Sequence, residues 1–341
     1  MHSQCTNGKG KYKFRILYHK SDLKSIRFLE VIKTMILKPE QMDFSDKNII
    51  MIISGLPGVG KTTLALSAPD VLLIDADEGI SRVKPEHRKD SSIVKKYEDV
   101  LADLKACEGQ YKTIVIDTCG ALIELMKDWA MRTEPTASKK TGGFSQQGYG
   151  IIKSEFLRLS AELKRKFNVI YLFHVAKNKD GDETFYDLIC EGSTKDIVWQ
   201  PADLGAYLHI INGERYLGFT PTANYNAKAA YGIKGFVKVP ELGDGDKNDF
   251  LTKLFEKVKA NIKAEADSLK PQQEAYEKIM EAGRRIINAV GSVDNVPEAI
   301  AAINNLDHAL TSKTELKDLL KKRLAELNII YNKETKTYEQ Q

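Results

Sequence analysis

Short apolar runs alternate with longer mixed segments along the chain from Lys47 onward. The runs are rich in Ile, Val and Leu and do not alternate strictly with polar residues, which is typical of strands covered on both faces by helices. Strands and helices in alternation predict an α/β fold with a largely parallel sheet. Five runs predict its strands: NIIMIIS (48–54), DVLLIDA (70–76), TIVID (113–117), NVIYLFH (168–174) and AYLHII (206–211).

The segments after the third and fifth runs add helices and a turn. Between the third and fourth runs the pattern predicts helices over 121–131 and 151–166, separated by a long polar loop at 132–150. The fifth run leads into Asn212-Gly213, a pair that favours a tight turn between antiparallel strands. The parallel core should therefore end in antiparallel strands.

The pattern changes after Pro240. A polar stretch (241–249) is followed by a predicted helix over 250–269, and Pro271 predicts that the chain restarts there. Apolar positions at helical spacing continue through 272–330, so this part is expected to be helical throughout. The chain thus divides into a basic N-terminal extension (1–47), an α/β core (48–240) and a small helical C-terminal region (241–341).

Length and composition narrow the class of protein. The 341 residues have a mean hydropathy of −0.35, and no apolar run approaches the roughly 18 residues of a membrane helix. The first residues lack the apolar segment of a secretory signal, and the four cysteines show no CxxC spacing, which favours reduced thiols and argues against a zinc site. We therefore expect a cytoplasmic protein without a membrane partner.

Charge is distributed unevenly along the chain. The net charge is +4, but residues 1–47 hold ten Lys and Arg against five Asp and Glu, which leaves −1 on the remaining 294 residues. The body of the protein is therefore not uniformly basic. Any binding of nucleic acid by this part must come from local patches.

A phosphate-binding motif follows the first predicted strand directly. GLPGVGKTT fits the pattern G-x-x-x-x-G-K-[ST] and leads into a helix-forming segment, which is the context that the motif requires. Glycines let backbone N–H groups surround phosphate oxygens, the lysine adds a cation, and the first threonine offers a hydroxyl to Mg²⁺. We therefore expect ATP and Mg²⁺ as ligands, with contacts from Gly55, Leu56, Pro57, Gly58, Val59, Gly60, Lys61, Thr62 and Thr63.

Acidic residues end two of the predicted strands. Asp117 ends TIVID at the carboxyl edge of the sheet, where ligands collect in open α/β folds, and is the expected partner of Mg²⁺ at Thr62. Thr118 follows it, so the Asp-Glu pair that supplies the catalytic carboxylate of many ATPases is missing. The second strand ends in LLIDADEG, and we expect Asp77, or Glu78 beside it, to activate the attacking water, unless this segment is only a solvated acidic turn.

His174 ends the fourth predicted strand. An imidazole at this edge of the sheet could sense the terminal phosphate or hydrogen-bond the attacking water. A neutral histidine that merely satisfies a hydrogen bond of the core is nearly as common at such a position.

Together these segments resemble the core of RecA-like P-loop ATPases, and most closely the compact RecA-like phage proteins known as nucleotide-binding or single-strand annealing proteins. The resemblance covers roughly residues 48–240 and rests on GLPGVGKTT, VLLIDADEG, TIVIDTCGAL, YLFHVAK, HIINGERYLGF and NAKAAYG. It implies a RecA-like fold, ATP hydrolysis with Mg²⁺, and action on single-stranded DNA in recombination or replication. It also implies rings or filaments of identical subunits with ATP at their interfaces.

The same resemblance suggests roles for individual residues. By position the family's catalytic acid, usually Glu, corresponds to Asp77, a shorter acid, unless the loop brings Glu78 to the site. Polar residues that end the fourth strand couple the nucleotide to a DNA-binding loop in this family, a role that falls to His174. The family's basic residues after the final hairpin act across the subunit interface, which suggests Lys228, although the arginine often found two positions later is Ala230 here.

Two loops bind single-stranded DNA in RecA-like proteins, and they correspond here to residues 132–150 and 176–200. Both combine cations with aromatic rings, which suits contact with the phosphate backbone and stacking on bases. Surface loops of average lysine content are an almost equally good interpretation, and four acidic residues weaken the case for the second loop. The residues expected to contact DNA are Lys139, Lys140, Phe144, Tyr149, Lys177 and Lys179, with Arg132, Lys195 and Trp199 in the same loops.

Three functions are consistent with these features. The first, which we favour, is an ATPase that assembles on single-stranded DNA and is stimulated by it. The second is a small-molecule or nucleotide kinase, which needs a lid of arginines over the phosphates, whereas residues 132–150 hold only Arg132, and Arg82 and Arg88 lie elsewhere. The third is a nucleotide-switched adaptor with little turnover, whose C-terminal region engages another replication or recombination protein.

Overall fold

A nine-stranded sheet forms the centre of the computed structural model, which describes residue 44 and residues 46–180, 183–190 and 194–341. Residues 1–43 of the predicted N-terminal extension lie outside the described residues. The strands of the sheet are β1 (Ile50–Gly55), β2 (Val71–Asp75), β3 (Asp90–Ile93), β4 (Thr113–Asp117), β5 (Asn168–Asp180), β6 (Glu183–Leu188), β7 (Leu204–Ile211), β8 (Glu214–Gly218) and β9 (Phe236–Val239).

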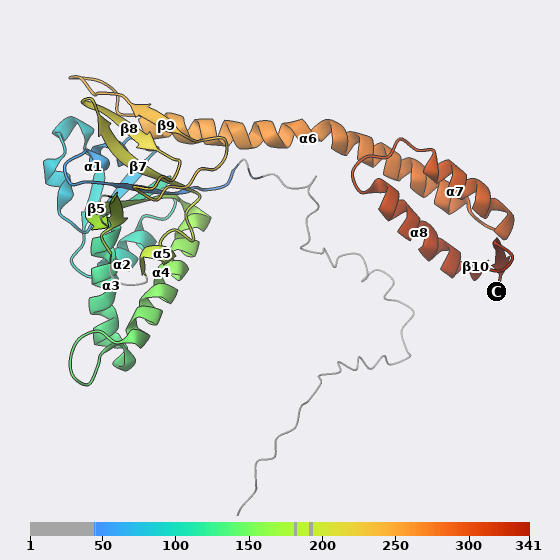
Figure 1. Cartoon of the computed structure of the whole chain (residues 1–341), viewed down its shortest axis with the longest axis horizontal. Coiled ribbons are helices and arrows are strands. Elements are labelled where there is room, and N and C mark those ends of the chain that lie inside the picture. Colours follow the sequence, from blue (N-terminus) through green and yellow to red (C-terminus); the bar gives the residue numbers. More distant parts are fainter. Residues whose placement is uncertain (1–43, 45, 181–182, 191–193) are drawn as a thin grey trace, which may run out of the picture. The chain divides into compact units, whose positions relative to one another are not determined.

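The order of the strands is β3-β2-β4-β5-β1-β7-β8-β9, with β6 paired to β5 (Figure 1). The sheet is parallel from β3 to β7 and ends in antiparallel strands, which confirms the predicted α/β class. The turn between β7 and β8 lies at Asn212 and Gly213, which both have positive φ angles. The sequence pattern does not predict β3, because this edge strand (DSSI) is polar and mostly exposed.

Helices cover both faces of the sheet because the residues of each inner strand are apolar on both sides. In β1, Ile50 and Ile52 face a core shared with α2, α3 and α4, whereas Met51 and Ile53 face a second core shared with α1 and α6. The result is a three-layer α/β/α arrangement. The helices are α1 (Lys61–Ala65), α2 (Tyr97–Ala106), α3 (Cys119–Thr133), α4 (Gln146–Lys166), α5 (Thr194–Ile197) and α6 (Phe250–Ala289).

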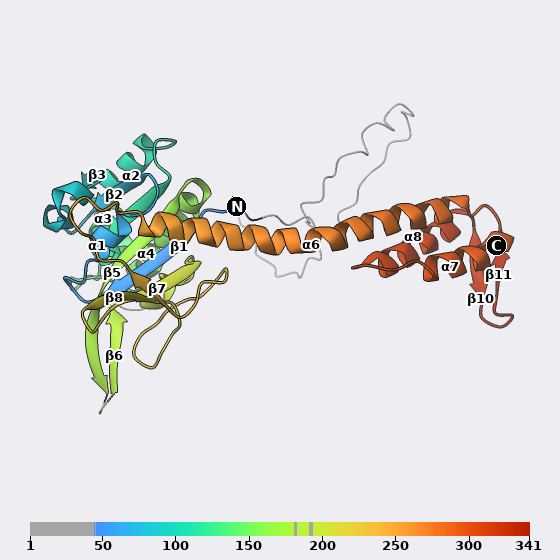
Figure 2. The same cartoon turned by 90° about the horizontal axis from the view of Figure 1, so that it is seen from above.

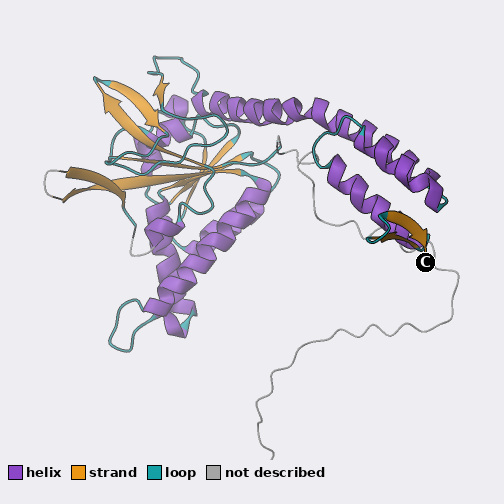
Figure 3. Ribbon diagram, turned by 45° about the vertical axis from the view of Figure 1, so that its right-hand side comes forward, coloured by secondary structure: helices purple, strands orange, loops and turns teal. Residues whose placement is uncertain are grey.

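The loop predicted at 132–150 is shorter in the structure. α4 begins at Gln146, because Ser145 caps the helix by accepting a hydrogen bond from Gly148 N at 3.0 Å. Tyr149 is therefore a helical residue. α3 and α4 extend away from the sheet, and the connection between them lies at their far ends (Figures 1 and 3).

Residues 176–180 and 183–188 of the loop predicted at 176–200 are β-strands, so the prediction is wrong for this part. β5 runs on past the sheet and pairs with β6, with Lys177 opposite Tyr186 and Lys179 opposite Thr184. Figure 2 shows this hairpin projecting from the body of the sheet. Because residues two apart in a strand point the same way, Lys177 and Lys179 lie on one face of β5.

α6 is a single helix of 40 residues with Pro271 inside it, so the predicted restart at this proline is wrong. The first half of α6 packs Leu251 and Phe255 into the second core of the sheet. The second half packs Tyr276 and Ile287 into a separate cluster. Packing of the stretches before and after Pro271 therefore stabilises the helix, although a proline inside a helix costs about 3 kcal/mol.

The C-terminal region is helical, as predicted, and has its own core. The second half of α6 packs with α7 (Val296–Asn304) and α8 (Ser312–Glu326). A short hairpin that the pattern does not predict, β10 (Ile329–Asn332) and β11 (Thr337–Gln340), follows α8. Among the described helices, none is both long and apolar enough to cross a membrane.

Candidate functional site

The motif GLPGVGKTT forms a tight loop between the end of β1 and the start of α1. Gly58 and Gly60 have φ angles of 80° and 92°, in the left-handed region that favours glycine. A Cβ on Gly60 would also come within 2.8 Å of the Arg215 guanidinium. The course of this loop therefore requires glycine at both positions.

Lys61 lies on the floor of the loop and is buried. Its ammonium donates hydrogen bonds to the carbonyl oxygens of Gly55 and Leu56, at 3.0 and 2.9 Å. Burial lowers the pKa of Lys61 to about 8, against the opposing attraction of Asp117 and Asp77. The loop thus holds a cation that has lost much of its hydration and faces a pocket of about 250 Å³.

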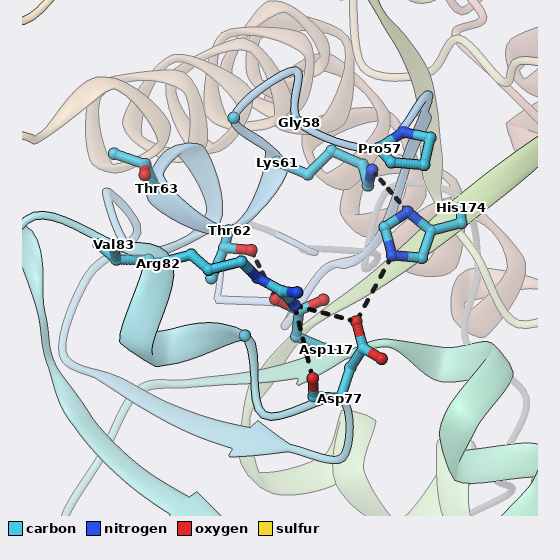
Figure 4. A pocket seen from close by; sticks show the side chains of 12 residues that line it. Pro57, Gly58, Lys61, Thr62, Thr63, Asp77, Arg82, Val83, Asp117 and His174 are labelled. Carbon is cyan, nitrogen blue, oxygen red and sulfur yellow. Dashed lines mark hydrogen bonds and ion pairs between the residues drawn. The ribbon is translucent and has the colours of Figure 1, made fainter.

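His174 connects this lysine to an acidic residue. It lies on β5, opposite Gly55 of β1 in the parallel register. Its Nδ1 is 3.1 Å from Lys61 Nζ, and because an ammonium can only donate, Nδ1 accepts and the neutral ring carries its proton on Nε2. Nε2 is 3.5 Å from Asp77 Oδ2, and Figure 4 shows the imidazole between the two side chains.

Thr62 and Asp117 form the second contact across the site. The Thr62 hydroxyl donates a hydrogen bond of 2.6 Å to Asp117 Oδ2, at the end of β4. Burial raises the pKa of Asp117, although the hydrogen bond from Thr62 opposes this effect. The described residues contain no group of three or more His, Cys, Asp and Glu that could hold a metal ion alone, so Mg²⁺ would need phosphate oxygens or water as further ligands.

The acid that ends β2 and the two acids that follow it differ in their surroundings. Asp75 is fully buried and accepts hydrogen bonds from the amides of Gly79 and Asp77, at 2.9 and 3.3 Å, so it shapes the turn. Asp77 lines the pocket. Glu78 forms an ion pair with Lys95 and does not line the pocket. The geometry therefore favours Asp77 over Glu78 as the acid of the site.

Arg82 is a residue of the pocket that the sequence analysis does not assign to the nucleotide site. Arg82 lines the same pocket, with Nη2 3.3 Å from Asp77 Oδ2. It ends the short 3₁₀ helix η2 (Gly79–Arg82), which turns back toward the carboxyl edge of the sheet. The hydrophobic pattern does not place this turn over the pocket, so it carries no signal that could have located Arg82.

The remaining predicted residues lie outside this pocket. The Lys228 side chain donates a hydrogen bond to the Ala202 carbonyl oxygen, and the residue is exposed. The residues predicted to contact DNA are likewise absent from the pocket lining.

The aromatic residues of the α3–α4 connection contact the protein. Phe144 packs against Gly148, lies edge-to-face with Tyr149 at 4.9 Å between ring centroids, and has the Lys127 ammonium 5.8 Å above its ring. Arg132 forms an ion pair with Glu98. Lys139 and Lys140 are exposed as well.

In the segment around the β5–β6 hairpin, some of the predicted residues are exposed and others contact the protein. Lys177 and Lys179 are exposed on β5. Lys195 forms an ion pair with Asp187. Trp199 packs on Gly205, where a Cβ would approach its ring to 2.3 Å, so this tryptophan serves the core.

A glycine-rich loop after a central parallel strand, with its lysine, threonine and a strand-end aspartate around one cavity, defines a P-loop nucleotide-binding domain. Residues 47–231, more than half of the chain, match a family model described as an AAA domain. The chain therefore belongs to this AAA domain family and carries an AAA-type P-loop ATPase domain.

Two solved structures are similar at a low level. An ATPase from the type III secretion system of pathogenic bacteria is 13% identical, with 82% of this chain and 81% of that chain covered and a TM-score of 0.34. The flagellar accessory protein FlaH from Methanocaldococcus jannaschii is 13% identical, with 57% and 91% covered and a TM-score of 0.30. Such TM-scores do not bear on function. No curated protein sequence matches the chain.

Proposed function

We propose that the protein hydrolyses ATP with Mg²⁺ in the pocket formed by the P-loop, Asp77, Asp117 and His174. The observation that carries this proposal is the convergence of five side chains around a single cavity. Lys61 and Thr62 begin α1, Asp77 follows β2, Asp117 ends β4 and His174 lies within β5. Membership of the AAA domain family supports nucleotide hydrolysis at such a site.

The residues present fit ATP and Mg²⁺ chemically. Lys61 and the backbone of residues 55–63 would hold the phosphates, and Mg²⁺ held near Thr62 and Asp117 would neutralise phosphate charge. Asp77 accepts a proton from a water molecule whose oxygen attacks the terminal phosphorus. The bond between that phosphorus and the bridging oxygen breaks, which releases ADP and inorganic phosphate. His174, between Lys61 and Asp77, orients the acid.

The test is the rate of ATP hydrolysis by the wild type and by Lys61→Ala. We expect the variant to lose turnover while its thermal unfolding stays unchanged, because the hydrogen bonds of Lys61 join it to the loop itself and to His174 and not to the hydrophobic cores. Persistent hydrolysis by the variant would contradict the proposal. Tight ATP binding by the wild type, with turnover no faster than that of the variant, would identify a nucleotide-switched adaptor instead.

A matched pair of variants tests the choice of the acid. Asp77→Asn should lower kcat at least 100-fold, because an amide cannot accept the water proton. Glu78→Gln, one residue further on, should leave kcat within about twofold, since Glu78 pairs with Lys95 outside the pocket. The reverse order of effects would transfer the role to Glu78.

We further propose that single-stranded DNA stimulates this hydrolysis, in recombination or replication, as the resemblance to phage proteins implies. Lys177 and Lys179 support the proposal, because they are exposed on one face of the strand that also carries His174. Lys139 and Lys140 offer a second exposed pair at the α3–α4 connection.

The DNA proposal is tested by adding single-stranded DNA at two salt concentrations. We expect stimulation that fades with salt, because contacts with the phosphate backbone release counterions. Replacing Lys177 and Lys179 together with Ala should weaken the stimulation, whereas replacing Lys333 and Lys336, in and beside the β10–β11 hairpin, should not. Turnover that depends on Lys61 but is indifferent to DNA would favour the kinase or the adaptor.

We also propose that copies of the chain assemble with ATP between them. Lys228 lies outside the pocket of its own chain, so any contact with nucleotide would have to come from a neighbouring copy. Sedimentation velocity with ATP and DNA tests this assembly. A monomer under all conditions would exclude it.

A further inference from the structure

Arg82 has a fixed backbone and a loosely held side chain. The Asp75 carboxylate accepts hydrogen bonds from the amides of Gly79 and Ile80, both at 2.9 Å, which pins the start of η2. The Arg88 guanidinium donates to the carbonyl oxygen of Ser81 at 3.1 Å and so supports its end. The position from which Arg82 reaches into the site is therefore well determined.

The guanidinium of Arg82 makes only weak contacts. Its Nη2 donates to the Asp77 carboxylate at 3.3 Å, which is long for a charged pair, and to the Asp77 carbonyl oxygen at 3.4 Å. The Arg82 side chain is 69% exposed. Exposed ion pairs of this kind stabilise proteins little. Figure 4 shows the side chain extended toward Asp77. Arg82 can thus exchange this partner at small cost.

The charges around the pocket favour such an exchange. Lys61 makes three close contacts, with two loop carbonyls and His174, whereas the guanidinium of Arg82, the other cation of the lining, makes two long ones to Asp77. A phosphate group accepts two parallel hydrogen bonds from a guanidinium and binds it better than a solvated carboxylate at 3.3 Å does. An Asp77 released from Arg82 is also a freer acceptor for a water proton.

Resting on the proposed function, we infer that Arg82 leaves Asp77 and binds the terminal phosphate of ATP held by its own subunit. The same movement neutralises charge on the reacting phosphate and frees the acid. ADP lacks the terminal phosphate, so Arg82 stays on Asp77 when ADP is bound. The residue therefore distinguishes ATP from ADP, and it does so without a neighbouring subunit.

The first experiment measures binding, so it does not depend on turnover. Dissociation constants for a non-hydrolysable ATP analogue and for ADP, both with Mg²⁺, are obtained by competition with a fluorescent nucleotide. In Arg82→Ala we expect the affinity for the ATP analogue to fall tenfold or more and that for ADP to change less than twofold. Lys84→Ala is the matched control, because Lys84 is an exposed cation two residues away that does not line the pocket. It should bind both nucleotides like the wild type.

The second experiment asks whether Arg82 acts on its own subunit. Arg82→Ala and Lys61→Ala are mixed, and hydrolysis is compared with that of each variant alone. If Arg82 served a neighbour, mixed assemblies would join an intact P-loop to an intact Arg82 and regain activity. We expect no recovery, and recovery would overturn the inference.

The binding ratio separates this inference from the proposed function. Equal losses of ATP-analogue and ADP affinity in Arg82→Ala, or no loss of either, would overturn the role of Arg82 even if the wild type hydrolyses ATP. The proposed function would be overturned if the wild type hydrolysed ATP no faster than Lys61→Ala does. In that case a selective loss of ATP-analogue affinity in Arg82→Ala would still assign Arg82 to the terminal phosphate.

Discussion

Single residues of the nucleotide pocket owe their chemistry to close neighbours. The Lys61 ammonium contacts two carbonyl oxygens and an imidazole nitrogen, all within 3.1 Å of Nζ, in place of water. Burial lowers the pKa of Lys61 to about 8, although the negative charges of Asp117 and Asp77 oppose this effect. The lysine therefore changes charge close to physiological pH.

The affinity for ATP should consequently fall at alkaline pH. Phosphate binds the ammonium form of Lys61, which is the major form at pH 7 and a minor form at pH 9 if its pKa is about 8. The dissociation constant of the Mg²⁺-ATP analogue should therefore rise about tenfold between these pH values. Fluorescence competition across this range measures the change. A constant affinity would mean that Lys61 stays protonated throughout.

Asp203 is the centre of a second cluster of charged residues, outside the pocket. Its carboxylate accepts hydrogen bonds from Lys47 at 2.7 Å, Lys164 at 3.0 Å and Tyr231 at 3.1 Å, and from the Ile50 amide at 3.0 Å. Burial alone would raise the pKa of Asp203, but these donors outweigh it and lower the pKa. The ionised form therefore stabilises the fold.

Asp203→Asn should lower the free energy of unfolding by about 3 kcal/mol at pH 7, because it removes the charge that two lysines share. A lowered pKa contributes stability above the unfolded pKa of about 3.9 and loses it as pH falls through the folded value. The difference between wild type and variant should therefore shrink below about pH 4. Urea unfolding at several pH values measures it, and a difference independent of pH would contradict this account.

Sequence reasoning found those site residues that end or follow a buried apolar run. Asp117 and His174 follow buried runs, and the parallel sheet brings such positions to one edge. Two features could not be found in this way. Arg82 reaches the pocket through the turn of η2, and Asp77 is distinguished from Glu78 by Lys95, a residue from another segment. Both depend on where side chains point, which periodicity does not encode.

Among the elements, α6 departs most from local sequence rules. Pro271 lies in the span 263–275, where the described side chains are exposed or half-buried and none is buried. The proline does destabilise the helix locally, but the packing of α6 before and after this span keeps the helix continuous. Sequence analysis could not weigh this, because the two cores involve residues far apart in the chain.

Pro271→Ala should therefore strengthen the middle of α6. The change allows one more backbone hydrogen bond and removes a steric clash. In an isolated helix, replacing proline by alanine stabilises the helical state by about 3 kcal/mol. Amides of the span 263–275 should exchange with solvent at least tenfold more slowly, as measured by hydrogen–deuterium exchange. Gln272→Ala serves as the control and should leave exchange nearly unchanged. Faster exchange in Pro271→Ala would show that the proline supports the span.

In the whole molecule, the C-terminal cluster and the two cores of the sheet are separate sets of buried residues. The first half of α6 contributes to one core of the sheet, and its second half contributes to the C-terminal cluster. We therefore expect damage to one core to spare the other. The boundary at residue 241, suggested by polar composition, precedes α6, so the core of the sheet also includes part of the proposed C-terminal region.

Leu316→Ala tests this independence. Leu316 is fully buried and packs against Gly283 of α6, so its truncation should destabilise the C-terminal cluster by about 3 kcal/mol. Thermal unfolding should show this loss while the affinity for ATP at 25 °C stays within twofold of wild type. Leu73→Ala, at a fully buried position in β2, is the control that should destabilise the nucleotide-binding part. Equal weakening of ATP binding by both variants would contradict independence.

Because α6 is continuous, it also fixes the angle about the helix axis between the side chains of its first half and those of its second half. An α-helix turns about 100° and rises about 1.5 Å for each residue, so one residue inserted within 263–275 would rotate everything after it by more than a quarter turn. Seven inserted residues would restore the heading to within about 20°. An insertion of seven residues would therefore keep the apolar faces of the two halves of α6 nearly in line along the helix, whereas an insertion of one or two would not.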